Sequence, residues 1–287
     1  MKTNHKQLRT ALFAVAVLAF LASAIAHADN IYVSCFDSGT IEKFDSSGNR
    51  STFAAGLNGP MGLAFDDGFN FYVVNYWNAT VEKFDSSGNR STFASGLNTP
   101  WGLALDNSGN LYLSELEVGR IEKFDSSGYR STFASGLGSP CGLAFDSIGN
   151  LYLSESETGR IEKFDSSGNR STFASGLDTP SGLAFDSSGN LYVANFSGKT
   201  IERFDSSGNG VTFASGLDYP FDLAFDSIGN LYVSCSDSGT IEKFDLSGNG
   251  TIFASGLNGP VFIATQVPEP ATLLLLGLGV VIARRKR

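Results

Sequence analysis

One position of the sequence could supply metal ligands, and it recurs six times at intervals of 40 residues. Its occupants are Cys35, Asn75, Glu115, Glu155, Asn195 and Cys235. Carboxylate and amide oxygens are the ligands that a hard cation such as calcium prefers. If the repeats close into a ring, these side chains approach a common axis and could hold calcium. The alternative interpretation pairs Glu115 and Glu155 with Arg120 and Arg160 as ordinary salt bridges.

Histidine chemistry is excluded for the exported chain. The only histidines, His5 and His27, precede Asp29 and lie within a predicted signal peptide. Without them the chain lacks a Ser-His-Asp triad, a Cys-His pair and a histidine-bound zinc. No glycine-rich phosphate loop stands between a strand and a helix. Two catalytic routes remain, a water activated by calcium or an acid–base pair of Glu115 and Glu155.

The elements that would position these residues come from an internal repeat. Prolines stand at positions 60, 100, 140, 180, 220 and 260, a strict spacing of 40. Each unit contains four short strand signals separated by Gly/Asn/Asp/Ser turns. In the third unit we expect strands a to d over Gly102–Asp106, Asn110–Ser114, Arg120–Asp125 and Arg130–Ala134. Strand c breaks strict alternation, which predicts two covered faces or a bulge.

Four strands per 40 residues is the signature of a propeller blade. The sequence therefore predicts an all-β, six-bladed propeller over residues 29–266, with four antiparallel strands per blade. Strand b occurs first, near Ile31, and the last copy of strand a is Val261–Ala264. The C-terminal strand should join the first blade and close the ring, which removes exposed edges. The Asp-Ser-x-Gly-Asn segments are interpreted as hairpin turns in which the aspartate binds its own backbone.

Sequence differences among the six copies concentrate in the b–c loops and around the prolines, which emerge on one face of a propeller. Aromatic residues gather there and predict a binding surface. The alternative is that they only cover the core. The candidate ligand-binding residues are Phe36, Tyr76, Trp77, Trp101, Phe196 and Phe221.

Both ends of the chain are predicted to be processing segments. Residues 1–28 form a signal peptide, with basic residues, an apolar run and an Ala26-His27-Ala28 cleavage site. Residues 267–287 contain Pro268-Glu269-Pro270, a short apolar helix that could cross the membrane, and a basic end. The whole chain has a net charge of −9; its two ends contribute +6, so residues 29–266 carry −15. Such a surface repels nucleic acid and anionic membranes.

Export places the three cysteines in an oxidising compartment. Cys35 and Cys235 occupy equivalent positions on neighbouring units across the ring closure. We therefore expect a Cys35–Cys235 disulfide that fastens the ring, with Cys141 left as the free thiol.

Two resemblances extend these predictions. The unit, with Pro-x-Gly-Leu-Ala-Phe-Asp, Gly-Asn-Leu-Tyr-Val and Arg-Ile-x-x-Phe-Asp, resembles the NHL repeat and is similar to gluconolactonase and streptogramin-lyase propellers. The gluconolactonase resemblance implies a central calcium, here held by Glu115 or Glu155, Asn75, Asn195 and Asp222. The histidine that streptogramin-lyase-like enzymes use is absent. Residues 267–287 resemble the PEP-CTERM sorting signal of Gram-negative bacteria. That resemblance implies exosortase cleavage, transient anchoring in the inner membrane and delivery to the cell surface or an extracellular polysaccharide matrix.

These observations favour an exported, non-enzymatic binding or scaffold protein that engages polysaccharide or another surface protein. Nucleic acid is not expected as a partner, and contact with membrane is expected only through the tail before processing. The main alternative is a calcium-dependent, gluconolactonase-type lactonase or esterase, and a further one is a purely architectural matrix protein. No cofactor other than calcium is implied.

Overall fold

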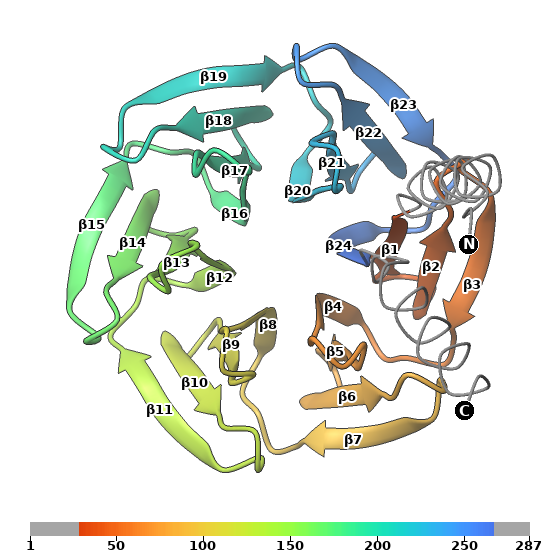
Figure 1. Ribbon diagram of the computed structural model, residues 1–287, viewed down its shortest axis with the longest axis vertical. Coiled ribbons are helices and arrows are strands. Elements are labelled where there is room, and N and C mark those ends of the chain that lie inside the picture. The colour runs from red at the N-terminus through yellow and green to blue at the C-terminus, as the bar shows by residue number, and fades with distance from the viewer. Residues whose placement is uncertain (1–28, 267–287) are drawn as a thin grey trace, which may run out of the picture.

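The structure, a computed structural model, describes residues 29–266 as 24 strands in six four-stranded antiparallel sheets around one axis (Figure 1). The predicted signal peptide and sorting tail lie outside these residues. Within residues 29–266 no helix is long and apolar enough to cross a membrane. From the axis outward, blade 1 consists of β24 (Pro260–Gln266), β1 (Asn30–Cys35), β2 (Thr40–Phe44) and β3 (Arg50–Ala54). Blade 2 consists of β4 (Pro60–Phe65), β5 (Phe71–Asn75), β6 (Thr80–Phe84) and β7 (Arg90–Ala94).

The other four blades repeat this order without interruption. Blade 3 contains β8 (Pro100–Leu105), β9 (Leu111–Glu115), β10 (Arg120–Phe124) and β11 (Arg130–Ser135). Blade 4 contains β12 (Pro140–Phe145), β13 (Leu151–Glu155), β14 (Arg160–Phe164) and β15 (Arg170–Ser175). Blade 5 contains β16 (Pro180–Phe185), β17 (Leu191–Asn195), β18 (Thr200–Phe204) and β19 (Gly210–Ser215). Blade 6 contains β20 (Pro220–Phe225), β21 (Leu231–Cys235), β22 (Thr240–Phe244) and β23 (Gly250–Ala254).

The predicted ring closure is confirmed. Strand β24 pairs antiparallel with β1, with Asn30 opposite Gln266 and Tyr32 opposite Ala264. The inner strands then contact one another all the way round, including β20 with β24 and β24 with β4. The edge of β1 that would otherwise be open is thereby paired, which is how the closing strand protects the first blade.

Glycine and leucine alternate along the inner strands because neighbouring blades approach very closely there. A Cβ atom on Gly102 would lie 2.3 Å from the carbonyl oxygen of Cys141 in the next blade. The leucine that follows each glycine position faces the axis, where a ring of aliphatic side chains lines the channel: Leu63, Leu103, Leu143, Leu183, Leu223 and Ile263. The alternation of small and bulky residues along each inner strand allows this packing.

Aromatic residues fill the wedge between blades. Tyr112 of β9 makes edge-to-face contacts with Phe133 of the same blade and Phe145 of the next blade, at centroid distances of 5.1 and 5.0 Å. The same arrangement recurs around Tyr152 and Tyr192. Edge-to-face contacts stabilise beyond the burial of area alone. The high phenylalanine content therefore serves the seams between blades.

Observed strand bounds differ from the expected ones by one or two residues, because each inner strand begins at its proline and strand b extends to the residue after its serine. Strand c has two covered faces, one of the two expected alternatives, since both Ile121 and Phe124 are buried. The bulge lies in strand d instead, because the β10–β11 register passes from Ile121–Ala134 to Glu122–Thr132 and leaves Phe133 without a partner. The a–b turns are the predicted hairpin devices, as Asp106 Oδ1 accepts hydrogen bonds from the backbone N–H groups of Ser108 and Asn110.

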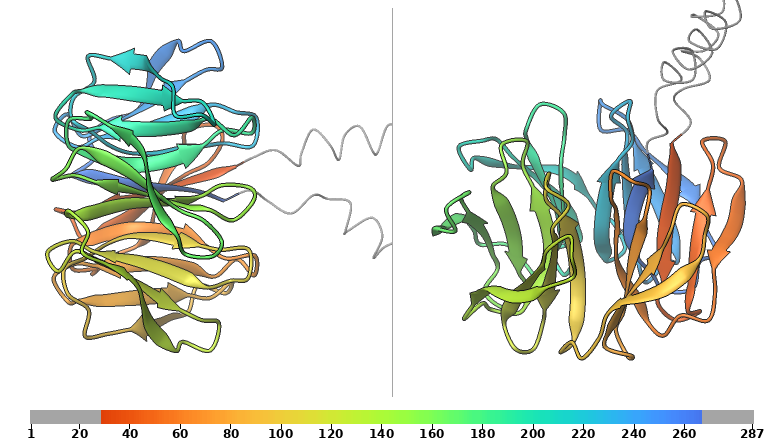
Figure 2. Two further views of the ribbon diagram at one scale, coloured as in Figure 1. Left: turned by 90° about the vertical axis from the view of Figure 1, so that its left-hand side faces the viewer. Right: turned by 60° about the horizontal axis from the view of Figure 1, so that its bottom comes forward.

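The blade order gives the ring two unlike faces, seen edge-on in Figure 2. The a–b and c–d turns form one face, here called the turn face. The b–c loops and the linkers between blades form the other, here called the loop face. Because β1 begins and β24 ends among the a–b turns, Asn30 and Gln266 both lie at the turn face. The loop face is therefore directed away from the ends of the propeller.

Candidate functional site: the loop face

The six aromatic residues predicted at the loop face come together into one continuous band. Phe36 lies 6.0 Å from Trp77, and Trp77 lies 4.7 Å from Tyr76, between ring centroids. Tyr76 in turn contacts Trp101 at 5.8 Å. Trp77 is the most accessible of these side chains, with 64% of its surface exposed.

The centre of the band lies over the channel. Trp101 of blade 3 stacks on Phe221 of blade 6 at 5.9 Å and an interplanar angle of 29°, although these blades lie opposite each other in the ring (Figure 1). Below them the channel contains a cavity of about 300 Å³, walled by the aliphatic ring and Asp222. The Trp101–Phe221 pair therefore covers the axial position that a central ligand would need from this face.

One residue of the band, Tyr219, was not among the residues predicted from the sequence. Phe221 contacts Phe196 at 5.9 Å, and Phe196 contacts Tyr219 at 5.1 Å. The ammonium group of Lys199 lies 4.1 Å from the centre of the Tyr219 ring, in a cation–π contact. We define the aromatic band as Phe36, Tyr76, Trp77, Trp101, Phe196, Tyr219 and Phe221.

Backbone strain is also present at this end of the band. Lys199 has φ 56° and Tyr219 has φ 53°, in the left-handed region that costs free energy for bulky residues. Four of the six copies have glycine at the Lys199 position. Ala79, Thr99, Ser139 and Thr179 at equivalent positions have the same left-handed backbone, so this conformation belongs to the repeat. The signal available in the sequence was the replacement of Gly, Thr or Ser before the proline by an aromatic residue.

The recurrent position at the end of strand b does not face the axis. The carboxylate of Glu115 is fully buried, and it accepts a hydrogen bond from the backbone N–H of Asn98, in the linker that enters its blade, at 2.8 Å. It also pairs with Arg120 at 2.5 Å and with Arg130 at 3.0 Å. The Glu115 carboxylate raises the pKa of the Arg120 guanidinium. Both carboxylate oxygens thus have cationic or amide partners inside one blade.

The other predicted ligands occupy separate blades in the same way. Glu155 pairs with Arg170 at 2.7 Å, whereas Asn75 and Asn195 accept hydrogen bonds from the backbone N–H groups of Asn58 and Asp178. Across residues 29–266 there is no group of three or more His, Cys, Asp or Glu side chains arranged to hold a metal ion. As arranged, these residues do not fit a calcium site, because the carboxylates already have arginine partners.

The last residue of strand b and the first residue of strand c, which lie opposite each other, change together from one repeat to the next. Opposite Glu115 and Glu155, strand c begins with arginine; opposite the asparagines and cysteines it begins with threonine. A carboxylate therefore occurs only where a guanidinium is supplied across the hairpin. This correlation favours the salt-bridge interpretation for Arg120; Glu155 uses Arg170 of strand d instead of the expected Arg160.

A paired substitution tests this coupling. We expect Glu115→Asn alone to lower the free energy of unfolding by about 2 kcal/mol, since it removes one of the two buried carboxylates, Glu115 and Glu122, with which Arg120 and Arg130 pair; the partial exposure of the arginines keeps the effect below that of a fully buried pair. Adding Arg120→Thr reproduces the Asn–Thr pair of blades 2 and 5 and should recover most of the loss. Urea denaturation of the three proteins measures both effects. Equal stability of the single and double variants would contradict the coupling.

The expected disulfide is wrong for this structure. Cys35 and Cys235 are buried free thiols, as is Cys141. The thiol of Cys235 lies 3.7 Å from the Glu242 carboxylate of its own blade, so its side chain is directed within that sheet and not toward blade 1. Burial raises the pKa of Cys35 to about 11 and that of Cys235 to about 12. The reactive thiolate is thus suppressed at neutral pH.

Asp222 lies apart from the other predicted ligands, on the inner strand of blade 6. Its carboxylate accepts a hydrogen bond from the backbone N–H of Ile263 on the closing strand, at 3.0 Å. Burial in the channel wall raises its pKa to about 7. Four of the other inner strands have glycine at the equivalent position and so carry no carboxylate there. Asp222 therefore marks the seam where the ring closes.

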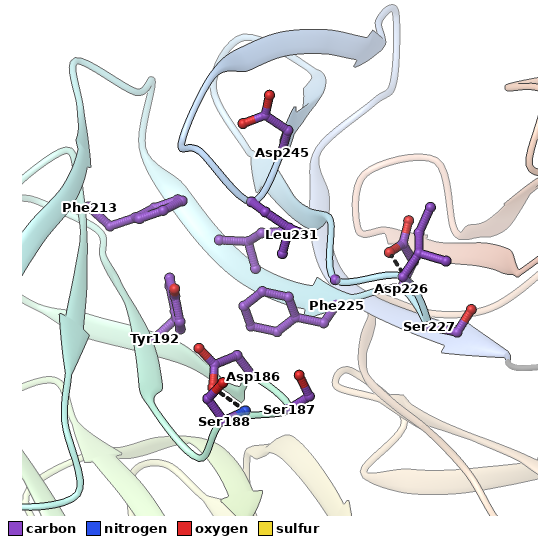
Figure 3. Close-up of a pocket in the computed structure, with 13 residues that line it drawn as sticks. Asp186, Ser187, Ser188, Tyr192, Phe213, Phe225, Asp226, Ser227, Leu231 and Asp245 are labelled. Carbon is purple, nitrogen blue, oxygen red and sulfur yellow. Dashed lines mark hydrogen bonds between the residues drawn. The ribbon is translucent and has the colours of Figure 1, made fainter.

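A pocket of about 260 Å³ lies on the opposite, turn face, between blades 5 and 6 (Figure 3). Tyr192, Phe213 and Phe225 form its walls, and Asp186 is at its edge. The Asp186 carboxylate is occupied by its own turn, where it accepts hydrogen bonds from Ser188 and Asn190. The pocket is therefore part of the wedge between two blades. The carboxylates of its turns leave no free catalytic group.

Comparison with protein families supports one prediction at the C-terminus. Residues 266–287 match the model described as the PEP-CTERM protein-sorting motif. The chain carries an exosortase sorting signal. It is therefore an exported protein that is anchored transiently through its tail. Residues 129–214, less than a third of the chain, match the SMP-30/gluconolactonase/LRE-like region. A comparison with curated protein sequences finds no match.

Solved structures share the propeller fold. A propeller in a nidogen/laminin complex matches with a TM-score of 0.75 and 23% identity, over 83% of this chain and 98% of that one. A streptogramin B lyase matches with a TM-score of 0.66 and 14% identity, over 81% and 82%. A gluconolactonase from Xanthomonas campestris matches with a TM-score of 0.65 and 17% identity, over 73% and 84%. At these identities the likeness concerns the fold alone.

Proposed function

We propose that this exosortase-sorted propeller is a non-enzymatic binding protein of the cell surface or extracellular matrix of a Gram-negative bacterium, and that its loop face binds polysaccharide. The observation that carries the proposal is the aromatic band, which runs across the loop face through contacts of 4.7 to 6.1 Å. Aromatic rings offer large contact area with little loss of side-chain entropy.

The position of the chain ends supports this orientation. The sorting motif follows directly after β24, whose last residue, Gln266, lies at the turn face. A propeller attached through that end presents its loop face outward. The varied, aromatic face is then available to an extracellular polymer, while the turn face is nearer the attachment.

Trp77 provides the sharpest test of binding. We expect Trp77→Ala to weaken binding of a linear polysaccharide about tenfold, because the exposed indole provides a large contact area at low entropic cost. Affinity electrophoresis of residues 29–266 through gels containing β-1,3-glucan, chitosan or alginate measures the change; the ring of this segment is closed by its own strands. Thermal stability should change little, since the side chain is mostly exposed.

Leu246→Ser is the matched control for that experiment. Leu246 is also a large exposed side chain, with 80% of its surface accessible, but it lies on the turn face where the other blades have serine. We expect the Leu246→Ser variant to bind polysaccharide as tightly as the unmodified protein does. Equal loss in both variants, or retardation by none of the polymers, would refute polysaccharide binding by the loop face and favour a protein partner.

A calcium-dependent lactonase is the second candidate. The match of residues 129–214 to the gluconolactonase-like region, which includes Glu155 and Asn195, favours it. Against it stand the Glu155–Arg170 ion pair and the Trp101–Phe221 cover over the channel. Stoichiometric calcium in the purified protein, together with lactone hydrolysis abolished by Glu155→Gln, would establish this candidate.

A further inference from the structure

The charge of the loop face restricts which polysaccharide the aromatic band can take. We infer that the ligand is a linear polysaccharide without anionic groups, either uncharged or amine-bearing. This inference rests on the proposed function and adds the chemical class of the ligand. It follows from three features of the loop face: the shape of the band, the acids beside it and the hydrogen-bonding groups that accompany it.

The shape of the band calls for an extended ligand. It begins at Phe36 and Trp77 in blades 1 and 2, crosses the axis at Trp101 and Phe221, and ends at Phe196 and Tyr219 beside blade 5. A small compact sugar would cover only one part of it. A chain of sugar rings lying across the face would contact successive aromatic rings along a continuous row.

Acidic residues dominate the loops on both sides of the band. The b–c loops and blade linkers contain Asp37, Glu117, Glu157, Asp178, Asp218 and Asp237. Five of these side chains are exposed and Asp218 is half-buried. A single lysine, Lys199, occurs in the same loops. A polymer that carries carboxylate or sulfate groups would be repelled along its whole length, whereas a neutral chain would not be.

Two of the three bases at this face are already paired with acids. The ammonium group of Lys199 lies 3.5 Å from the Asp218 carboxylate and over the Tyr219 ring. Arg120 is held by buried Glu115. Arg160 is exposed, but it stands in the same hairpin as Glu157. No patch of uncompensated positive charge therefore lies along the band.

The polar groups of the loop face suit a polyhydroxyl ligand. Ionised carboxylates are acceptors only, so the acids beside the band can receive hydrogen bonds from sugar hydroxyl or ammonium groups. An uncharged or amine-bearing sugar can donate hydrogen bonds to these acids through its hydroxyl or ammonium groups.

Three polymers of different charge test the inference on residues 29–266. At low ionic strength we expect binding to neutral β-1,3-glucan and to cationic chitosan, and at least tenfold weaker binding to anionic alginate. Neutralising four exposed acids together (Asp37→Asn, Glu117→Gln, Glu157→Gln and Asp237→Asn) should strengthen alginate binding at least tenfold. The same change should weaken chitosan binding and leave β-1,3-glucan binding within twofold. Circular dichroism verifies that the variant keeps its fold.

The outcomes separate this inference from the proposed function. Alginate binding as tight as β-1,3-glucan binding, and lost in Trp77→Ala, would overturn the charge argument while leaving the loop face as a polysaccharide site. Binding to none of the three polymers would overturn both. An alginate affinity that does not respond to the four substitutions would also overturn the inference, since repulsion by these acids would then not set the selectivity.

Discussion

A propeller that ends at Gly259, without strand β24, is expected to lose its cooperative fold. The missing strand buries Val261, Phe262 and Ile263, each of which contributes about 2 kcal/mol by burial. Their sum, about 6 kcal/mol, is comparable with the whole stability of a typical domain, about 5–15 kcal/mol. The truncation also exposes the edge of β1 and unpairs the seam with blade 6.

Thermal unfolding followed by circular dichroism compares residues 29–259 with residues 29–266. We expect a sharp transition only for the longer protein, together with aggregation or binding of a hydrophobic dye by the shorter one, since the uncovered edge can pair with other chains. A truncated protein that melts within a few degrees of the longer one would show that the ring does not depend on its last strand.

Asp222→Asn is expected to stabilise the propeller at neutral and alkaline pH. Burial raises the pKa of Asp222 from 3.8 to about 7 in the folded protein. Because the unfolded chain gives up this proton more readily, the Asp222 contribution to stability falls as pH rises from about 4 to about 7 and stays low above that. A shift of about three pKa units corresponds to about 4 kcal/mol. Asparagine keeps an oxygen for the Ile263 N–H without carrying charge.

Chemical denaturation at several pH values measures this difference. The two proteins should be nearly equal at pH 4, and Asp222→Asn should be more stable by about 4 kcal/mol at pH 8. Both proteins share the turn aspartates, such as Asp85, whose pKa is lowered by hydrogen bonds from Asn89. Their contribution to the pH dependence of stability therefore cancels in the comparison. Asp222→Gly restores the residue found in four other inner strands and tests whether the carboxyl group also fills needed space. A stability difference that does not change with pH would contradict the argument.

The seam between blades 6 and 1 stabilises the fold, whereas the loop face contains strained backbone. At the seam, Ser234 donates a hydrogen bond to the backbone carbonyl of Val261, and Thr265 donates one to that of Phe225. These bonds join the last blade to the closing strand. The loop face, in contrast, carries strained residues such as Lys199 and Tyr219. The closed ring provides the stability that lets the loops vary without loss of fold.

The sequence by itself determined the architecture, because the same pattern of strands and turns occurs six times. A proline every 40 residues, a glycine where blades meet and an Asp-Ser-x-Gly-Asn turn are each a local requirement that can be recognised in a short segment. The order of strands, beginning with strand b and ending with strand a, predicted closure without any information on distances. The aromatic face followed from the same topology.

Only the tertiary structure decided where side chains at equivalent positions point. Periodicity places Glu115, Glu155, Cys35 and Cys235 at the same level of the ring, but it does not say which side of the sheet each one faces. The structure turns them toward strands c and d of their own blades, which explains the arginine partners and the unpaired thiols. The Trp101–Phe221 contact joins opposite blades. It depends on the diameter of the channel, which no local pattern encodes.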